Sequence, residues 1–444
     1  MKTLPVFAVS PLMFFGGFAL LCNLSGNTTD CKSTSTAAPP SFSKDVAPII
    51  LKNCATCHHP GEVAPFSLLT YADVSKHAKQ IAAVTSARTM PPWKAESHGE
   101  FNNERRLSDN EIALIGEWAN SGTPMGDPKS LPETPKFNAG WKLGKPDRVL
   151  GLGEPFKVDP DGRDIYRCFV IPANVDAEQY IQAMEVHPGN KAIVHHVIAY
   201  VDTSGAARKL DEADAGPGYS TSGGGPGFVP AGFIGGWAPG NEPRFLPDGV
   251  GNLIPKGSDI VLEVHYHKNG KPESDQTQVG VYFNKTPVHK RIRSLMVINP
   301  FLRIPAGAEN HPVTANAPIF KDITVLDCTP HMHLVGHDMR VDVTLPDNTK
   351  KQLVNVPNWD FNWQTSYQYK NPLKIPSGSK VSLLAHYNNS TSNPHNPNSV
   401  PKVITWGEQT TDEMCIAFIA YTVDEEDLIE GKSAGNARIP SSKR

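Results

Sequence analysis

The sequence predicts a multidomain chain in which a small all-α domain is followed by two all-β domains, built as jelly rolls or β-sandwiches. Residues 42–126 show the apolar spacing of short helices, whereas the sequence after residue 144 alternates with period two. A stretch rich in proline and glycine, 124–145, separates the two patterns and indicates a domain boundary. A chain of 444 residues is long enough to bury several cores.

The N-terminal residues 1–25 are predicted to be a signal peptide or a membrane anchor. An apolar run, Leu4–Leu24, follows a single Lys2, which is typical of an export signal. We therefore expect an exported protein, either periplasmic or anchored to the outer face of the membrane. Cys22 would suit lipidation, but the bulky Leu21 before it disfavours that reading. Residues 26–41 are rich in Ser, Thr, Ala and Pro and are expected to form a linker.

Residues 42–126 are predicted to contain three short helices. The first carries Ile49 and Ile50, and the third begins at a capping box formed by Ser108 and Glu111. The second has apolar residues at helical spacing: Val74, Ala78, Ile81 and Val84. This module has too little apolar core of its own, and a haem would supply the missing apolar mass.

A cysteine motif, Cys54-Ala55-Thr56-Cys57-His58, has the spacing of covalent haem attachment. Both thiols can reach one macrocycle, and the imidazole of His58 can bind its iron. Met90, which precedes a proline, is the predicted second axial ligand, and His77 is a weaker alternative. Half of a zinc site or a redox dithiol would also use two such cysteines, and Met90 could instead be a packed core residue.

The β region is predicted to divide into residues 144–300 and 301–428, with the junction near Asn299–Pro305. Period-two alternation and flanking turn residues mark the strands. The predicted strands are Ile165–Ile171, Ala192–Val201, Ser258–His267, Gln278–Phe283, Met339–Leu345, Lys380–His386 and Cys415–Val423.

Histidines within this β region suggest two metal sites. His331 and His333 are two residues apart, so on a strand they point to the same face. Met414 would add a soft thioether ligand, and two histidines with a methionine favour copper. A non-haem iron site would need a carboxylate beside two histidines, and neither Asp338 nor Glu263 has that placement.

The second histidine set is upstream. His195 and His196 are adjacent, so they can bind one ion only where a bulge or a strand end turns both toward it. His265 is the predicted third ligand, and His267 on the same face is a competing one.

These motifs resemble the copper type II, ascorbate-dependent monooxygenases, the family of peptidylglycine α-hydroxylating and dopamine β-monooxygenase. The resemblance covers roughly Gly144–Asp427, and its motifs occur in the family's order. They are Val194-His195-His196, Gly236-Trp237-Ala238-Pro239 to Leu246-Pro247-Asp248-Gly249-Val250, Val264-His265-Tyr266, His331-Met332-His333 and Asp412-Glu413-Met414-Cys415. Residues 42–126 instead resemble a cytochrome c-like haem domain, so the whole chain looks like a fusion of the two.

The resemblance implies two tandem β-sandwich domains with one copper each, facing across a solvent-filled cleft. In this reading His195, His196 and His265 hold a copper ion that stores and delivers an electron. His331, His333 and Met414 hold the catalytic copper ion, where O2 binds and a C–H bond is hydroxylated. The expected cofactors are therefore two copper ions and one c-type haem, attached covalently through Cys54 and Cys57 and bound at its iron by His58 and Met90.

The chain also departs from the family. Residues that hold the substrate carboxylate in the peptide hydroxylase fall on Thr329, Ile416 and Phe418, so the substrate class is open and the pocket is expected to be more apolar. The family's disulfide partners are mostly missing. A disulfide between Cys328 and Cys415 is an open alternative.

The sequence therefore predicts an exported copper-dependent monooxygenase that receives electrons through a haem. Its expected partners are a small-molecule substrate, O2 and a one-electron donor, either an ascorbate-like reductant or a redox protein. A net charge of −3 provides no basic surface for nucleic acid. The rival hypothesis is a non-catalytic copper-binding or electron-transfer protein on the same scaffold.

Overall fold

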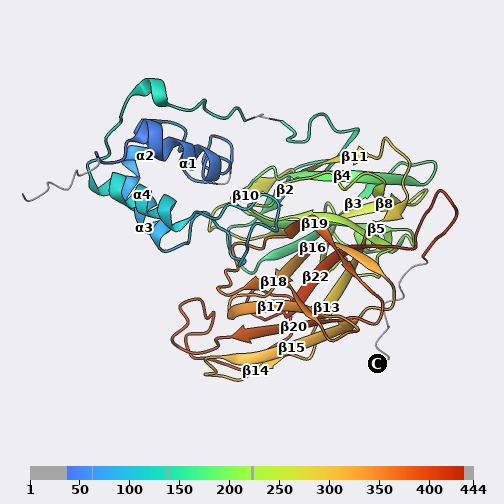
Figure 1. Cartoon of the computed structure of the whole chain (residues 1–444). Helices are drawn as coiled ribbons and strands as arrows, with labels where there is room; N and C mark the ends of the chain where they lie inside the picture. Colours follow the sequence, from blue (N-terminus) through green and yellow to red (C-terminus); the bar gives the residue numbers. More distant parts are fainter. Residues whose placement is uncertain (1–37, 63, 138–139, 222–224, 435–444) are drawn as a thin grey trace, which may run out of the picture. The chain divides into compact units, whose positions relative to one another are not determined.

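The computed structural model describes residues 38–62, 64–137, 140–221 and 225–434 (Figure 1). The predicted signal peptide or anchor, 1–25, and most of the predicted linker, 26–41, lie outside the described residues. Pro39–Arg444 forms one compact unit. Within the described ranges, none of the helices has the length and apolar character needed to span a bilayer.

Two five-stranded sheets form the first half of the β region. One has the strand order β1 (Arg148–Gly151), β11 (Gln278–Phe283), β4 (Gln179–His187), β8 (Val250–Ile254) and β12 (Lys290–Arg291). The other has the order β6 (Tyr219–Thr221), β3 (Ile165–Pro172), β9 (Asp259–Tyr266), β5 (Val194–Asp202) and β7 (Gly232–Trp237). A two-stranded sheet accompanies them, formed by β2 (Phe156–Val158) and β10 (Glu273–Asp275).

Two four-stranded sheets form the second half. One has the order β13 (Arg293–Ile298), β22 (Ile416–Val423), β16 (Ile323–His331) and β19 (Tyr367–Ile375). The other has the order β15 (His311–Pro318), β20 (Lys380–Tyr387), β17 (Gly336–Thr344) and β18 (Lys350–Val356). A small sheet pairs β14 (Arg303–Ile304) with β21 (Ile404–Thr405).

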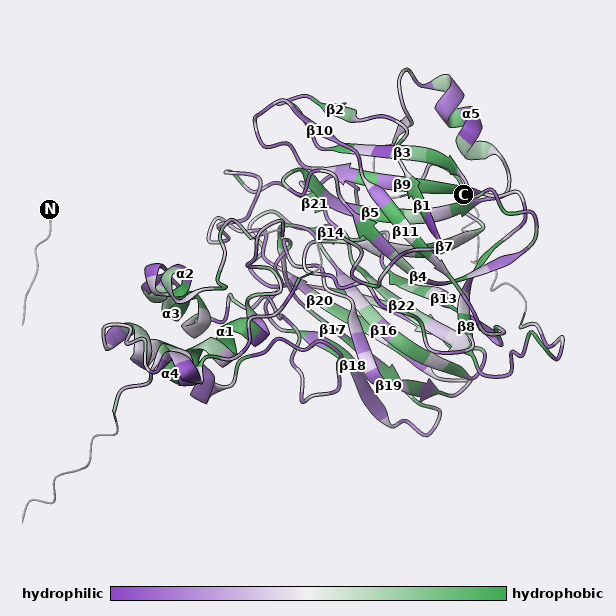
Figure 2. Cartoon of the chain, turned by 90° about the horizontal axis from the view of Figure 1, so that it is seen from above, coloured by the Kyte–Doolittle hydropathy of each residue, from purple (hydrophilic) through white to green (hydrophobic). Residues whose placement is uncertain are grey.

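The core of the β region lies in two large clusters of buried apolar residues. One cluster draws on both four-stranded sheets and includes Val325, Val341 and Ile419. The other draws on both five-stranded sheets and includes Val197 and Leu262. Figure 2 shows hydrophobic residues along β16, β20 and β22. Each pair of sheets is therefore held by its own apolar cluster, which fixes the strand ends that carry the histidines.

The helices are short. They are α1 (Ala47–Asn53), α2 (Tyr71–Lys76), α3 (Ala78–Ser86), α4 (Asp109–Asn120) and α5 (Ala206–Ala213), with a π-helical turn at Phe42–Val46 and a 3₁₀ turn at Pro128–Ser130. The predicted capping box of Ser108 and Glu111 is confirmed at the start of α4. The predicted second helix is split into α2 and α3 at His77, and α2 has its own capping box from Thr70 and Asp73.

The predicted fold class, a cytochrome c-like all-α domain followed by two all-β jelly-roll or sandwich domains, is wrong. The described part of the chain is mostly β, with 36% of its residues in strands and 13% in helices. Within the described residues no all-α domain of the cytochrome type stands by itself. The domain boundaries at 126, 144 and 300 stay predictions.

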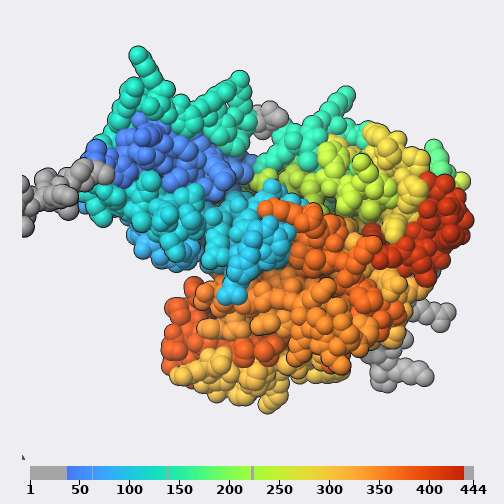
Figure 3. All heavy atoms as spheres, in the orientation of Figure 1, coloured from blue at the N-terminus to red at the C-terminus, as the bar shows by residue number. Residues whose placement is uncertain are grey.

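The physical reason is that some apolar residues of the helical segment, residues 42–126, pack in the core of the β region. Ala95 and Phe101 lie in the core cluster of the four-stranded sheets, where Phe101 is 1% exposed. Phe101 forms a β-bridge with Tyr369 on β19, and its ring also contacts Tyr367. Figure 3 shows the cyan atoms of this segment against orange atoms of the C-terminal half. Burying the Phe101 side chain contributes about 1.5–3 kcal/mol to the free energy of folding. This contribution favours packing of the helical segment on the β region.

The individual strand predictions, by contrast, are confirmed within a few residues. Gln278–Phe283 has the same bounds as β11, and Ile165–Ile171 differs from β3 by one residue. The remaining predicted strands correspond to β5, β9, β17, β20 and β22.

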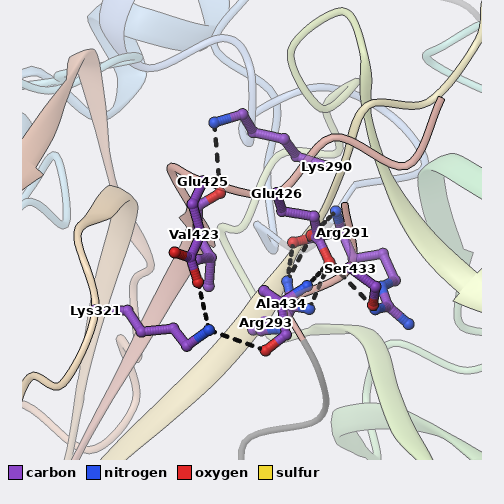
Figure 4. A network of polar contacts seen from close by, with 9 residues as sticks. All are labelled: Lys290, Arg291, Arg293, Lys321, Val423, Glu425, Glu426, Ser433 and Ala434. Atoms are coloured by element: carbon purple, nitrogen blue, oxygen red, sulfur yellow. Dashed lines mark hydrogen bonds and ion pairs between the residues drawn. The ribbon is translucent and has the colours of Figure 1, made fainter. Parts of the chain in front are cut away.

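A buried carboxylate joins the C-terminal segment to the junction between the sheets. Glu426, whose side chain is fully buried, pairs with Arg291 at 3.1 Å and with Arg293 at 2.8 Å (Figure 4). It also accepts a hydrogen bond from the backbone N–H of Arg291 at 2.8 Å. The neighbouring Glu425 is 64% exposed and pairs with Lys321. Glu426 therefore anchors β12 and β13 to the residues that follow β22.

Candidate metal centres

Three histidines of the second five-stranded sheet converge on one point. His196 on β5 lies directly opposite His265 on β9, and the pairing of the two strands shifts register between Val194 and His196. This bulge lets the adjacent His195 turn its ring to the same side, as the sequence required. The ligand nitrogens of the three residues all lie within 4.8 Å of one another.

The ring nitrogens that face one another are the Nδ1 atoms. Nδ1 of His196 lies 3.2 Å from Nδ1 of His195 and 3.4 Å from Nδ1 of His265. On its other side, Nε2 of His265 donates a hydrogen bond to Asp164 at 2.9 Å, so its Nδ1 carries a lone pair. Where all three Nδ1 atoms carry lone pairs, a soft cation can bind all of them at once.

Asp164 and Tyr166 hold His265 in this orientation. Asp164 also accepts a hydrogen bond from Thr410 at 3.0 Å and one from His267 at 3.1 Å. The Tyr166 ring stacks on the His265 ring at 4.2 Å and 14°. His267 thus contacts the carboxylate that orients His265 and does not belong to the converging group. An acidic partner on a ligand histidine fixes the ring and raises its basicity.

Burial keeps these imidazoles neutral, which is the form that binds a metal. Burial and the neighbouring His265 lower the pKa of His195 to about 3. The same causes hold the pKa of His196 well below its ordinary value. Burial, although Asp164 opposes it, also lowers the pKa of His265.

The second predicted set lies where β16 ends. His331 is the last residue of β16 and is paired with Ile416, while His333 follows two residues beyond the strand. Their ring centroids are 5.2 Å apart and the rings are at 89°. Nδ1 of His331 donates to Oε1 of Gln364 at 2.7 Å, and Nδ1 of His333 donates to the carbonyl of Asp412 at 3.2 Å. Both Nε2 atoms are therefore the free ligand positions.

The buried carboxylate of Glu413 links the backbone of Met414 to that of His333. Oε2 of Glu413 accepts hydrogen bonds from the backbone N–H groups of His333 at 2.8 Å and of Met414 at 3.1 Å. The hydroxyl of Tyr387 donates to the Met414 carbonyl at 2.7 Å. Met414 itself is 7% exposed. These contacts hold the Asp412–Met414 segment beside His333.

Burial lowers the pKa of His331 to about 4 and that of His333 to about 3, so both rings are neutral at physiological pH. Burial raises the pKa of Glu413 to about 8, although backbone N–H groups oppose the shift. Two neutral imidazoles, with a methionine in the neighbouring segment, are the soft, uncharged ligand types that fit copper.

The two sets are in contact through one aromatic side chain. The Phe361 ring stacks on His195 at 4.9 Å and 14°, and meets His333 edge-on at 5.9 Å. Tyr166 also donates a hydrogen bond to the carbonyl of Glu408 at 3.1 Å. Phe361 and Tyr166 therefore make contacts between the two sets, where the sequence predicted a solvent-filled cleft.

The cysteine motif lies at the end of α1. The N–H groups of Cys57 and His58 both donate to the Cys54 carbonyl, which folds the motif into one helical turn. Nδ1 of His58 lies 3.1 Å from the Phe66 carbonyl and must donate to it, so Nε2 is free to bind iron. Burial raises the pKa of the Cys54 thiol to about 12. The contacts found for the described residues include none between Met90 and His58.

The cysteines of the described region are all free. Cys168, Cys328 and Cys415 are buried thiols, so the possible Cys328–Cys415 disulfide does not form. Cys22 and Cys31 lie outside the described residues.

The residues that orient the ligands were not predicted from the sequence: Asp164, Phe361, Gln364 and Glu413. Two features of the sequence could have pointed to Asp164 and to the loop that holds Phe361 and Gln364. Asp164 immediately precedes a strand that pairs with the His265 strand, and the run Trp359-Asp360-Phe361-Asn362-Trp363-Gln364 places aromatic residues in a loop between two strands. Aromatic residues in a connecting loop indicate a role beyond the core.

The chain is similar in sequence to proteins of known families. Residues 305–439 match the model of the copper type II ascorbate-dependent monooxygenase C-terminal domain. DBH-like monooxygenase protein 2 of Mus musculus is 26% identical over 290 residues, which cover 59% of this chain and 44% of that protein. The chain therefore matches less than half the length of this relative.

Solved structures give weak likenesses. PNGase F, a glycosylasparaginase from Flavobacterium meningosepticum, is 14% identical over 62% of this chain and 96% of that chain, with a TM-score of 0.26. The VP2 subviral particle of infectious bursal disease virus is 9% identical over 63% and 72% of the chains, with a TM-score of 0.18. These scores carry no argument. The informative match is that of residues 305–439, which are similar to the C-terminal domain of copper type II ascorbate-dependent monooxygenases.

Proposed function

We propose that the protein is a copper-dependent monooxygenase that hydroxylates a C–H bond of a small organic substrate with O2. The observation that carries this proposal is the pair of histidine sets. In His265, His331 and His333 a hydrogen bond on one side of the ring leaves the other nitrogen free, and the ligand nitrogens of His195 and His196 lie within 4.8 Å of that of His265. The family match at residues 305–439 supports it.

In this proposal His195, His196 and His265 bind one copper ion, and His331, His333 and Met414 bind the other. Bound copper supplies the one-electron and O2 chemistry. The chain's own residues orient the ligands. Asp164 holds His265, Gln364 holds His331, and Glu413 fixes the backbone on which His333 and Met414 sit.

The substrate is proposed to lie against an apolar wall near His331. Phe418 has its ring centroid 6.4 Å from that of His331, and Ile416 pairs with His331 across the strands. Thr329 pairs with Phe418 in the same register and carries no positive charge. A glycine-extended peptide carboxylate would find no arginine at Thr329, so an uncharged, apolar reacting group fits better.

The test is substrate-dependent O2 uptake by the copper-loaded, reduced protein, measured with small aromatic and aliphatic molecules. Met414→Ile should abolish product formation, because a soft ligand is replaced by a side chain that cannot coordinate. Met296→Ile is the control, since Met296 is 43% exposed on β13. Unchanged product formation in Met414→Ile would contradict the assignment.

The rival function, a non-catalytic copper-binding or electron-transfer protein, is favoured by one observation. The positions that hold substrate in the peptide hydroxylase are Thr329, Ile416 and Phe418 here. The rival function would be favoured if bound copper cycles between its two oxidation states while the rate of O2 uptake is the same with and without each C–H substrate.

We further propose that a covalent haem at Cys54, Cys57 and His58 supplies the electrons, with Met90 as second axial ligand. The free Nε2 of His58 supports it. A pyridine haemochrome spectrum tests it: wild-type protein matured with haem should give a c-type spectrum, and Cys54→Ala with Cys57→Ala should not retain haem after acid–acetone extraction. Haem retention by the double variant would contradict covalent attachment. Met90→Ala should lower the reduction potential if Met90 binds iron.

Export to the periplasm, or anchoring to the outer face of the membrane through residues 1–25, belongs to the same proposal, with an ascorbate-like reductant or a redox protein as donor. Cell fractionation of the full chain and of a form lacking residues 1–25 tests it. Equal cytoplasmic retention of both forms would contradict export.

A further inference from the structure

The loop Trp359–Gln364 between β18 and β19 contacts both histidine sets. Phe361 stacks on His195 and meets His333, while Gln364 accepts a hydrogen bond from His331. Trp359 donates from Nε1 to the carbonyl of His333 at 3.0 Å. One six-residue loop therefore contacts a ligand of the first set and both histidines of the second.

The loop is also held from outside the two sets. Asp360 pairs with Lys94 of the helical segment at 3.1 Å, with side chains 12% and 30% exposed for Lys94 and Asp360. The backbone N–H of Trp359 donates to the carbonyl of His337 at 2.8 Å. Asn241, from the first half of the β region, donates to the Gln364 carbonyl at 3.5 Å. These anchors come from three separate parts of the chain.

The loop also contains hydrogen bonds of its own. Asn362 donates from both its backbone N–H and its side-chain Nδ2 to Asp360, each at 3.1 Å, and the N–H of Trp363 donates to the Asp360 carbonyl at 2.9 Å. Such an Asx turn fixes the backbone on either side of Phe361. The aromatic ring therefore has a defined position between His195 and His333.

We propose that Phe361 is a positioning residue that couples the geometry of the two histidine sets, so that they keep a fixed separation. The reasons are its two ring contacts, which join histidines of different sets, and the anchoring of its loop to both halves of the β region. The proposal rests on the proposed function in one respect: the distance it fixes would be that between two copper ions. The coupling itself is a property of the metal-free chain.

The first test uses metal-free protein labelled with 13C in its histidines. A ring stacked face to face on His195 shifts its proton resonances upfield. In Phe361→Leu this shift should be lost, and the resonances of His333 should move as well. Phe361→Tyr should keep the upfield shift of His195 and the wild-type resonances of His333, because tyrosine has the same aromatic face. Phe245→Leu is the matched control, since Phe245 is 45% exposed and contacts Tyr282; it should move neither.

The second test measures the separation of two Cu(II) ions by pulsed electron paramagnetic resonance in the loaded protein. Phe361→Leu should still bind two ions per chain but show a broadened distance distribution, and Phe361→Tyr should match the wild type.

Two results would overturn the proposal: His333 resonances that do not respond to Phe361→Leu, or a distance distribution that is unchanged in that variant. If the wild-type protein binds no copper, the proposed function fails, and the histidine resonances still decide whether Phe361 couples the two sets.

Discussion

Oδ2 of Asp164 lies 2.9 Å from Nε2 of His265, and the same oxygen accepts a hydrogen bond from Thr410 of the C-terminal half at 3.0 Å. Although burial acts to raise it, the hydrogen bond from His265 lowers the pKa of Asp164 to about 2. The carboxylate is therefore ionised throughout the physiological range and orients His265 at every such pH.

Replacing Asp164 should weaken copper binding at the three-histidine set. Asp164→Ala removes the acceptor that orients His265, and loss of such a partner typically costs about 10–100-fold in metal affinity. Competition titration with a Cu(I) chelator measures this affinity. Asp161→Ala, three residues earlier in an exposed turn, is the control and should bind copper as the wild type does. Equal affinity in both variants would exclude the orienting role of Asp164.

Replacing Glu413 should destabilise the fold around the second set. Its two oxygens accept hydrogen bonds from the backbone N–H groups of His333, Val335 and Met414 at 2.8, 2.8 and 3.1 Å, and the side chain is fully buried. Glu413→Ala leaves these donors unpaired, at about 1–3 kcal/mol for each such group before relaxation. Urea unfolding of the metal-free protein should show this loss, and Glu413→Gln, which keeps one acceptor oxygen, should lose less. A midpoint of Glu413→Ala equal to that of the wild type would refute the prediction.

The Glu426 network gives a comparison between neighbours. Glu426→Gln breaks a fully buried pairing with Arg291 and Arg293, which should cost about 3–5 kcal/mol in the free energy of unfolding. Glu425→Gln removes an exposed pairing with Lys321 and should cost no more than about 1 kcal/mol. Denaturant unfolding at neutral pH measures both, and equal losses would show that burial of Glu426 has no energetic consequence.

The same carboxylate predicts a pH dependence. Burial acts to raise the pKa of Glu426, but hydrogen bonds from Arg293 and from the Arg291 N–H, with the Arg293 charge, lower it from 4.5 to about 2. A lowered pKa in the folded state stabilises the fold above about pH 4.5, and that contribution is lost as the pH falls toward 2. The stability difference between wild type and Glu426→Gln should therefore shrink between these pH values. A difference that grows on acidification would contradict the assignment.

The joining of the helical segment to the β region can be tested at Phe101. Phe101→Ala should lower the free energy of unfolding by about 3–5 kcal/mol, because the ring is 1% exposed beside Tyr367 and Tyr369. Phe320→Ala is the control, since Phe320 is 81% exposed. If the strand signal in circular dichroism melts at the wild-type temperature in Phe101→Ala, the helical segment does not contribute to the stability of the β region.

Local pattern predicted the strands well because alternation reports burial on one face, as in Lys380–Tyr387, where every second residue from Val381 is buried. It failed for the fold class because the periodicity of residues 42–126 gives no sign that Phe101 leaves the helices to pair with Tyr369. The split at His77 was missed for a similar reason, since the apolar positions run through the break.

The sequence by itself determined which ligand types are available: two histidines spaced by one residue, a soft methionine, and an adjacent histidine pair that needed a bulge. Only the tertiary structure decided which nitrogen is free in the rings of His265, His331 and His333, because that depends on partners distant in sequence, such as Asp164 for His265 and Gln364 for His331. It also decided that Phe361 joins the two sets, since ring stacking depends on the packing of separate sheets and leaves no periodic trace in the chain.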